Sequence, residues 1–289
     1  MKATQLRQSI LQAAVQGKLV PQNAHDEPAT ELLKRIQKEK AQLVKEDKIK
    51  RGKPLPPITE DEIPYDLPDG WVWCRLGDVI LQNIGGGTPS KQNPDFWNGE
   101  IPWASVKDLN CDRLTQTIDT ITATGLENSS SNLIPAGSII LCTRMGLGKI
   151  AVNEIDVAIN QDLRAVFLPK DHVNMNYFIY FYKAQEITGS GMTVKGISLN
   201  ELHSLLLPLP PLTEQQRIVA KVDELMALCD EMKAAKDISV QRLASNIMPF
   251  PQQGEDEREI GIAARGEMQE ISAEAARDIR EMFGDDSNA

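Results

Sequence analysis

Hydrophobic residues recur every three or four positions in residues 4–20 and again in residues 30–43. Apolar side chains at this spacing share one face of a helix. Gly17 and Pro21 end the first pattern, and Thr30 begins the second. The sequence therefore predicts two N-terminal helices. Residues 52–70, which are rich in proline, predict a linker after them, because proline cannot continue a helix.

From Trp71 to about Leu207 the pattern changes to short apolar or β-branched runs, separated by Gly, Pro, Asn and Asp. Such runs are typical of strands, and they predict strands at residues 79–81, 118–122, 138–142, 150–152 and 165–168. A helical pattern interrupts them at residues 176–186. We therefore expect an α+β fold with a mixed or antiparallel sheet.

Residues 207–212 predict a short extended connector, and a long helix is expected from Thr213 to about residue 249. Thr213 and Gln216 fit a capping box at its start. Apolar side chains in this helix repeat at the spacing of a coiled-coil seam over two heptads. They are Ile218, Val222, Leu225, Cys229 and Met232. A helix that faces a core gives a similar stripe, so both interpretations stay open.

Composition and motif spacing indicate the cellular compartment of the protein. The chain has 289 residues, and its apolar runs are far shorter than the about 20 residues that cross a bilayer. The first seven residues lack the apolar centre of a signal peptide. The cysteines Cys74, Cys111, Cys142 and Cys229 are too scattered for a disulfide framework or a zinc site. We expect a cytoplasmic protein without a membrane segment or a metal.

Charge is unevenly distributed. Residues 1–54 carry a net +6, residues 55–212 a net −8, residues 213–254 a net −1 and residues 255–289 a net −7. A DNA-binding domain usually has a basic excess, so the middle region by its charge argues mildly against nucleic acid. The second helix has a basic face that is either solvated or a stripe facing phosphates. Its members are Lys34, Arg35, Lys38, Lys40, Lys45 and Lys48.

The sequence does not match the common catalytic motifs. Residues 146–149 resemble a phosphate loop, but Thr143 replaces its first glycine and Ile150 its Ser or Thr. Residues 93–96 lack the second proline of the amino-methyltransferase signature, and hydrolase and zinc-protease motifs do not occur. We therefore expect no catalytic residue.

Polar loops suited to binding DNA remain. Backbone amides and small hydroxyls contact phosphates, while Gln and Asn recognise adenine edges. A glycine-rich loop at residues 85–90 leads into several such groups. The candidates for DNA binding are Thr88, Ser90, Lys91, Gln92, Lys107, Arg144, Lys149, Asn160, Gln161 and Lys195. For each cation, a solvated surface side chain is the alternative.

Stretches in this order resemble the specificity (S) subunit of type I restriction–modification enzymes. They include LPDGWVW at 67–73, GGTPS at 86–90, WNGEIPW at 97–103, AINQ at 158–161 and LPPLTEQQRIV at 209–219. The resemblance covers residues 6 to about 235. It implies a target-recognition domain at 55–212, between N-terminal helices at 1–54 and a long helix at 213–249. An acidic, partly helical tail is expected at 250–289.

The resemblance also implies partners. These are double-stranded DNA and the methylation and restriction subunits of the same system, of which the methylation subunit would use S-adenosylmethionine. The chain itself needs no cofactor. Each domain motif occurs once, so the chain resembles a half-length subunit that pairs with itself through the 218–232 seam and the 4–20 helix. The alternative is an orphan half-subunit whose acidic tail makes it a regulatory protein or a DNA mimic.

Overall fold

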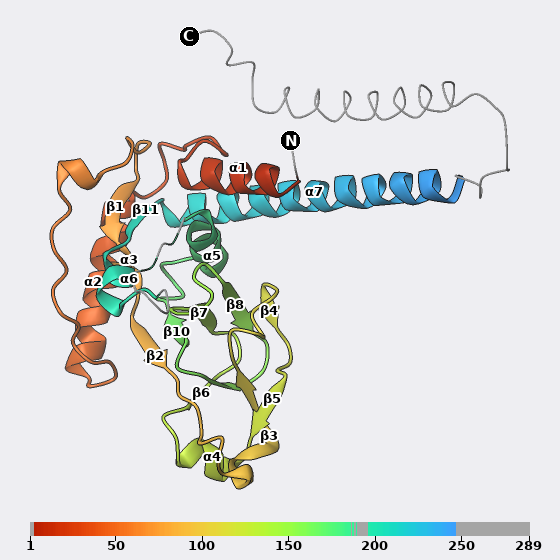
Figure 1. The fold of residues 1–289 in the computed structure, drawn as a ribbon. Helices are drawn as coiled ribbons and strands as arrows, with labels where there is room; N and C mark the ends of the chain where they lie inside the picture. The colour runs from red at the N-terminus through yellow and green to blue at the C-terminus, as the bar shows by residue number, and fades with distance from the viewer. Residues whose placement is uncertain (1–2, 186, 188, 190–195, 247–289) are drawn as a thin grey trace, which may run out of the picture. The chain divides into compact units, whose positions relative to one another are not determined.

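The structure, a computed structural model, describes residues 3–185, 187, 189 and 196–246, with side chains up to residue 239. The chain divides into two compact units, residues 1–229 and 230–289. The second unit is described only over residues 230–246, which are helical. The strands and the shorter helices belong to the first unit (Figure 1).

Helical periodicity in the sequence is confirmed by four helices. They are α1 (Ala3–Val15), α2 (Ala29–Lys45), α5 (Met175–Ala184) and α7 (Leu212–Asn246). The shorter helical elements are α3 (Leu76–Val79), α4 (Ala123–Glu127), α6 (Leu199–Ser204) and the 3₁₀ turns η1 (Glu60–Glu62) and η2 (Pro94–Phe96).

The strands form three sheets, two of which are mixed. They are β1 (Val72–Arg75), β2 (Gln82–Gly85), β3 (Trp97–Ala104), β4 (Arg113–Leu114), β5 (Asp119–Ile121), β6 (Asn132–Ile134), β7 (Ile139–Cys142), β8 (Ile150–Asn153), β9 (Val157–Ile159), β10 (Leu163–Phe167) and β11 (Leu206–Leu209). The sheet orders are β1-β11, β2-β10-β7-β8-β4 and β5-β3-β9-β6. Because β4 pairs with β8 in parallel and β3 with β9 in parallel, while the other pairs are antiparallel, the expected α+β fold with mixed sheets is confirmed.

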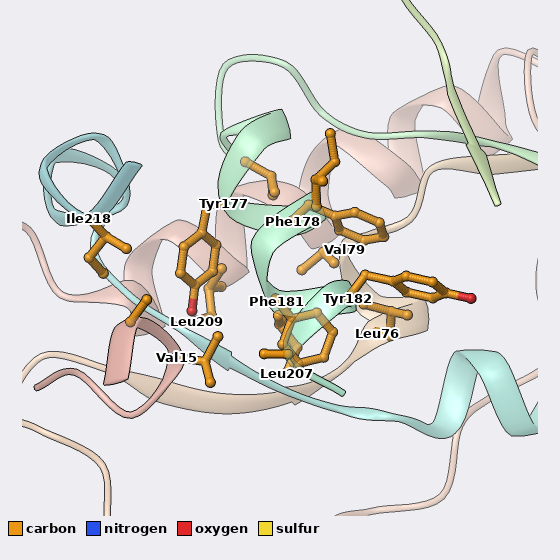
Figure 2. Close-up of a cluster of buried hydrophobic side chains, with 14 of the residues drawn as sticks. Val15, Leu76, Val79, Tyr177, Phe178, Phe181, Tyr182, Leu207, Leu209 and Ile218 are labelled. Carbon is orange, nitrogen blue, oxygen red and sulfur yellow. The ribbon is translucent and has the colours of Figure 1, made fainter. Parts of the chain in front are cut away.

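A hydrophobic cluster surrounds α5, as Figure 2 shows. The aromatic side chains of Tyr177, Phe178 and Phe181 are fully buried in it. Partners come from α1, α3, β11 and α7, and include Val15, Leu76, Val79, Leu207, Leu209 and Ile218. One cluster thus draws on residues 1–54, 55–212 and 213–249, and the domain boundaries at 54 and 212 stay a prediction.

The heptad stripe of α7 is mostly used inside the chain. Ile218, Val222, Leu225 and Cys229 are at most 5% exposed and belong to the same cluster as Ile10 and Ala14 of α1. Met232, in the second unit, is 42% exposed. The stripe is therefore core-facing over its first four positions. A coiled coil or self-pairing stays a prediction, and those four side chains are not available for it.

Residues 79–81 do not form the predicted strand. Residues 76–79 are the helix α3, and β2 begins only at Gln82. The carboxylate of Asp78 accepts a hydrogen bond at 2.9 Å from the backbone N–H of Arg75, which caps a helical turn. The apolar run is still buried at Val79 and Ile80, so the pattern predicted burial correctly and conformation wrongly.

The predicted capping box of α7 is also wrong. The helix begins at Leu212, so Thr213 lies inside it. The Thr213 hydroxyl instead donates to the carboxylate of Asp26 in the turn after α1. Hydrogen bonds from Arg217 and, to a lesser extent, from Thr213 lower the pKa of Asp26. Arg217 contacts Asp26 at 2.6 Å, and this contact ties the start of α7 to that turn.

The proline-rich linker is held against the fold by the buried side chain of Arg75. Its guanidinium donates to the backbone carbonyls of Pro56 at 3.2 Å and Pro57 at 3.0 Å, and to Glu62 at 2.8 Å. Hydrogen bonds from Arg75 and Thr59 lower the pKa of Glu62 from 4.5 to about 2. Residues 56–62 are therefore an ordered segment, clamped by charge-assisted bonds.

Candidate nucleic-acid interface

Four loops meet where the two larger sheets join. β3 and β9 run parallel and end together at Ala104 and Ile159. The ends of β2 and β7 both pair with the start of β10. The loops that leave these strands therefore lie side by side. We call them the loop surface: residues 86–92, 105–110, 143–149 and 160–162.

The glycine-rich loop is fixed by its backbone. The N–H of Gly87 donates to the carbonyl of Ile159 at 3.0 Å. The carbonyl of Gly87 accepts from Trp103 Nε1 at 3.1 Å and from Ser131 Oγ at 2.7 Å. At Gly86, an added Cβ would lie 1.9 Å from the carbonyl oxygen of Ile159, so only glycine allows this approach. The loop is therefore held firmly against residues 159–161.

The predicted pair Asn160 and Gln161 divides into two roles. Asn160 is 5% exposed, and its side-chain oxygen accepts a hydrogen bond at 3.0 Å from the backbone N–H of Asp162. Asn160 thus shapes the turn and lies away from solvent. Gln161 is exposed and hydrogen-bonds with the hydroxyl of Thr88, which joins two loops of the surface.

Lys149 links two further loops. Its Nζ donates to the carbonyl of Val106 at 3.2 Å and to Asn110 Oδ1 at 3.1 Å. Lys107 lies in the same loop as Val106 and is exposed. The turn that carries it is closed by Asp108, which accepts from the N–H of Ser105 at 2.8 Å. Lys149 therefore positions the loop, and Lys107 is the cation that faces solvent.

Arg144 is half exposed and lies 3.7 Å from the carboxylate of Asp162. The next residue, Met145, is 65% exposed. Its backbone φ is 59°, a positive value that residues other than glycine rarely adopt. The loop tip thus presents an apolar and a cationic side chain together.

The remaining candidates lie along the glycine-rich loop or outside the described residues. Ser90, Lys91 and Gln92 are exposed, and the carbonyl of Ser90 accepts from Trp97 Nε1 at 3.1 Å. Lys195 lies outside the described residues. The structure therefore gathers nine of the ten candidates on one set of loops, of which Asn160 and Lys149 are mainly structural.

The loop surface carries amide, guanidinium and ammonium side chains, which are groups that contact base edges and phosphates. Among the residues that the structure describes, no group of three His, Cys, Asp or Glu side chains could hold a metal ion. In the same residues, no helix has the length and apolar character that a membrane crossing requires.

Comparison with known proteins decides the family. The family model described as Type I restriction modification DNA specificity domain matches residues 68–242. The chain belongs to the type I restriction–modification specificity family. The specificity subunit of the type I restriction enzyme EcoAI of Escherichia coli is 37% identical over 246 residues, which cover 79% of this chain and 40% of that protein. The EcoEI specificity subunit of the same species is 33% identical over 249 residues, 79% of this chain and 41% of that protein.

A solved structure of a type I R-M system contains a chain of the same fold as this family member. Its TM-score is 0.54 at 24% identity, and the match covers 75% of this chain and 52% of the other. The chain spans about 40% of the length of the curated relatives above. The comparisons give no support to an orphan DNA mimic, and the acidic residues 255–289 that suggested one lie outside the described residues.

Sequence reasoning missed the residues that support the surface in this family member. Trp103 of β3 and Ser131, just before β6, hold Gly87, and Met145 stands at a loop tip. Trp103 lies in the motif WNGEIPW, which was a signal for family but not for a supporting role. Ser131 and Met145 carry no local signal, because their roles depend on strand pairing and exposure.

Proposed function

We propose that this chain is the DNA-reading part of a type I restriction–modification complex, and that its loop surface contacts the base pairs of double-stranded DNA. One observation carries the proposal: three loops from separate parts of the sequence bring the exposed side chains of Gln161, Arg144 and Lys107 close to one another. Gln fits adenine edges, and Arg and Lys fit guanine edges. Membership of the specificity family supports the same function.

In this proposal the chain has no catalytic activity and no cofactor of its own. The methylation and restriction subunits of the same system carry out the reactions, and the methylation subunit uses S-adenosylmethionine. Since the substrate is DNA, the chain acts in the cytoplasm. The relatives named above are specificity subunits of type I restriction enzymes, which supports this assignment of partners.

The single domain in this sequence recognises one part of a bipartite site. A second copy, paired through its helices, would present an identical surface in inverted orientation. Such a pair uses residues other than the four buried side chains of the α7 stripe. Exposed apolar side chains on α7, such as Leu228 and Met232, are suited to it.

The test is site-selective methylation of genomic DNA by the methylation subunit, with and without this chain. We expect modified bases to mark one sequence only when the chain is present. A symmetrical site indicates that two copies act together. Methylation that is the same without the chain contradicts the proposal.

A further inference from the structure

A basic groove lies beside the loop surface, and its volume is about 1060 Å³. One wall is the end of α2 with the segment that follows it, and the other is formed by α3, β2 and His203 of α6. The lining contains six lysine and arginine side chains and two aspartates. The groove is therefore locally basic in a chain whose net charge is −10.

The segment that carries most of these cations is anchored at both ends. After α2, Asp47 has a φ of 56°, which reverses the chain direction, and Ile49 is buried. At the other end, Leu55 packs against Gly77, where its Cδ1 lies 2.8 Å from the position of an added Cβ. Residues 50–54 form an exposed arch between these anchors. The fold thus holds the cations of the arch over the groove.

The cations of the arch are not neutralised by neighbours. Within the described part of the chain, no ion pair involves Lys50, Arg51 or Lys53. By contrast, Lys34 and Arg35, on the outer face of α2, contact Glu31 and Glu27. The basic face predicted for this helix is therefore not one stripe, because its cations lie in two different environments.

Lys40 and His203 lie on the floor of the groove. Lys40 donates to the carbonyl of Gly77 at 2.6 Å, and burial lowers its pKa. Burial, together with Lys40 and Arg164, also lowers the pKa of His203. Asp78 is the acidic group that raises the pKa of Lys40, and Asp47 lies on the arch side. The charges of Lys40 and Arg164 disfavour protonation of His203, and an anion bound here would offset that effect.

The groove leads directly into the loop surface. Asn83, Ile84 and Gly85 line it, and Gly86 follows as the first residue of the glycine-rich loop. Arg164 lies between the two regions, with its guanidinium donating to Asn83 Oδ1 at 2.7 Å and close to Gly85. The groove and the glycine-rich loop therefore adjoin at Gly85.

We infer that the groove binds phosphates of the same duplex, through Lys50, Arg51 and Lys53 of the arch. This inference rests on the proposed function. Unpaired lysines and arginines next to a base-contacting surface fit a phosphate backbone, which they hold without sequence preference. The competing occupant is an acidic surface of a partner protein, which the continuity with the loop surface disfavours.

The experiment compares a groove variant with a matched control. Lys50→Gln with Lys53→Gln removes two charges from the arch, and Lys34→Gln with Lys38→Gln removes two from the exposed outer face of α2. Binding to random-sequence duplex and to duplex selected by the wild-type chain is measured against salt, with the full chain alone and assembled with its methylation subunit. We expect the groove variant to bind both duplexes more weakly by the same factor, roughly tenfold. The slope of the logarithm of its binding constant against the logarithm of salt concentration should fall by about 2 in magnitude. The control should change neither.

The outcomes separate the two proposals. If the groove variant and the control bind alike while the wild-type chain binds DNA, the groove inference is wrong and the proposed function stands. If the groove variant no longer binds the methylation subunit but its DNA binding keeps the same salt dependence, the groove binds a partner protein and the inference is overturned. If the wild-type chain binds no duplex in either form, the proposed function fails, and the inference with it.

Discussion

The loop surface and the basic groove lie next to each other and are built in opposite ways. In the loop surface, several polar side chains bond within the surface: Lys149 bonds to Val106 and Asn110, and Arg144 pairs with Asp162. In the groove, Lys50, Arg51 and Lys53 of the arch are exposed and have no ion pair among the described residues. Internal hydrogen bonds fix geometry, which recognition of bases needs. Cations without an ion pair attract phosphates without requiring a fixed orientation, which is sufficient for contacts to the DNA backbone.

The largest effect on DNA recognition should come from moving the glycine-rich loop away from residues 159–161. Gly86→Ala puts a methyl group against the backbone carbonyl of Ile159, so the glycine-rich loop must move. We expect preference for the selected site to fall by about a hundredfold, because each well-placed pair of hydrogen bonds to a base edge provides roughly 1–3 kcal/mol of discrimination. Binding to random duplex should persist through the groove. Competition binding between selected and random duplexes measures this.

Gly52→Ala is the matched control, since an added Cβ at Gly52 has nothing within 4 Å. Its site preference should equal that of the wild-type chain. If Gly86→Ala keeps full preference, the register between residues 86–92 and 160–162 is not needed for recognition.

A smaller effect is expected at the tip of residues 143–149. Arg144→Gln should relax preference at one base-pair position by about 1–3 kcal/mol, since Arg144 is half exposed on the loop surface. Affinity for random duplex should fall much less than in the groove variant. Selection from a pool of random duplexes reports the relaxed position. An equal loss for every duplex would place Arg144 among phosphate contacts and break the comparison.

The smallest effect concerns how the arch is held. Glu62 has a pKa of about 2 in the folded chain against 4.5 ordinarily, so its bond with Arg75 stabilises the fold above about pH 4.5. This contribution is lost as the pH falls from 4.5 towards 2. Arg75 also holds Pro56 and Pro57, next to the arch. We expect acid to loosen this segment.

Thermal unfolding against pH, together with cleavage of residues 50–63 by pepsin, measures the effect. Glu62→Gln should remove this part of the pH dependence and expose the segment already at neutral pH, where a protease active at that pH reports it. A Glu62→Gln chain with the same pH profile as the wild type would show that the clamp does not depend on the carboxylate.

The sequence by itself determined the helices α1, α2, α5 and α7, most of the strands, the polar loops and the family. Periodicity and punctuation suffice for the helices, strands and loops, because they reflect local backbone preference and which side chains share a face. The family came instead from the resemblance of ordered motifs such as LPDGWVW and LPPLTEQQRIV. The failed catalytic motifs, together with polar loop residues such as Gln161 and Arg144, led to the expectation of binding rather than catalysis.

Only the tertiary structure decided which part of the chain each helix face packs against. The spacing of Ile218, Val222 and Leu225 fits a pairing seam and a core stripe equally, and packing against α1 and α5 selects the core. Likewise, the lysines of α2 look alike in sequence, yet Lys40 lies on the groove floor and Lys34 on the outer face. Periodicity records which residues share a face, whereas burial and charge pairing depend on distant segments, which come together only when the chain folds.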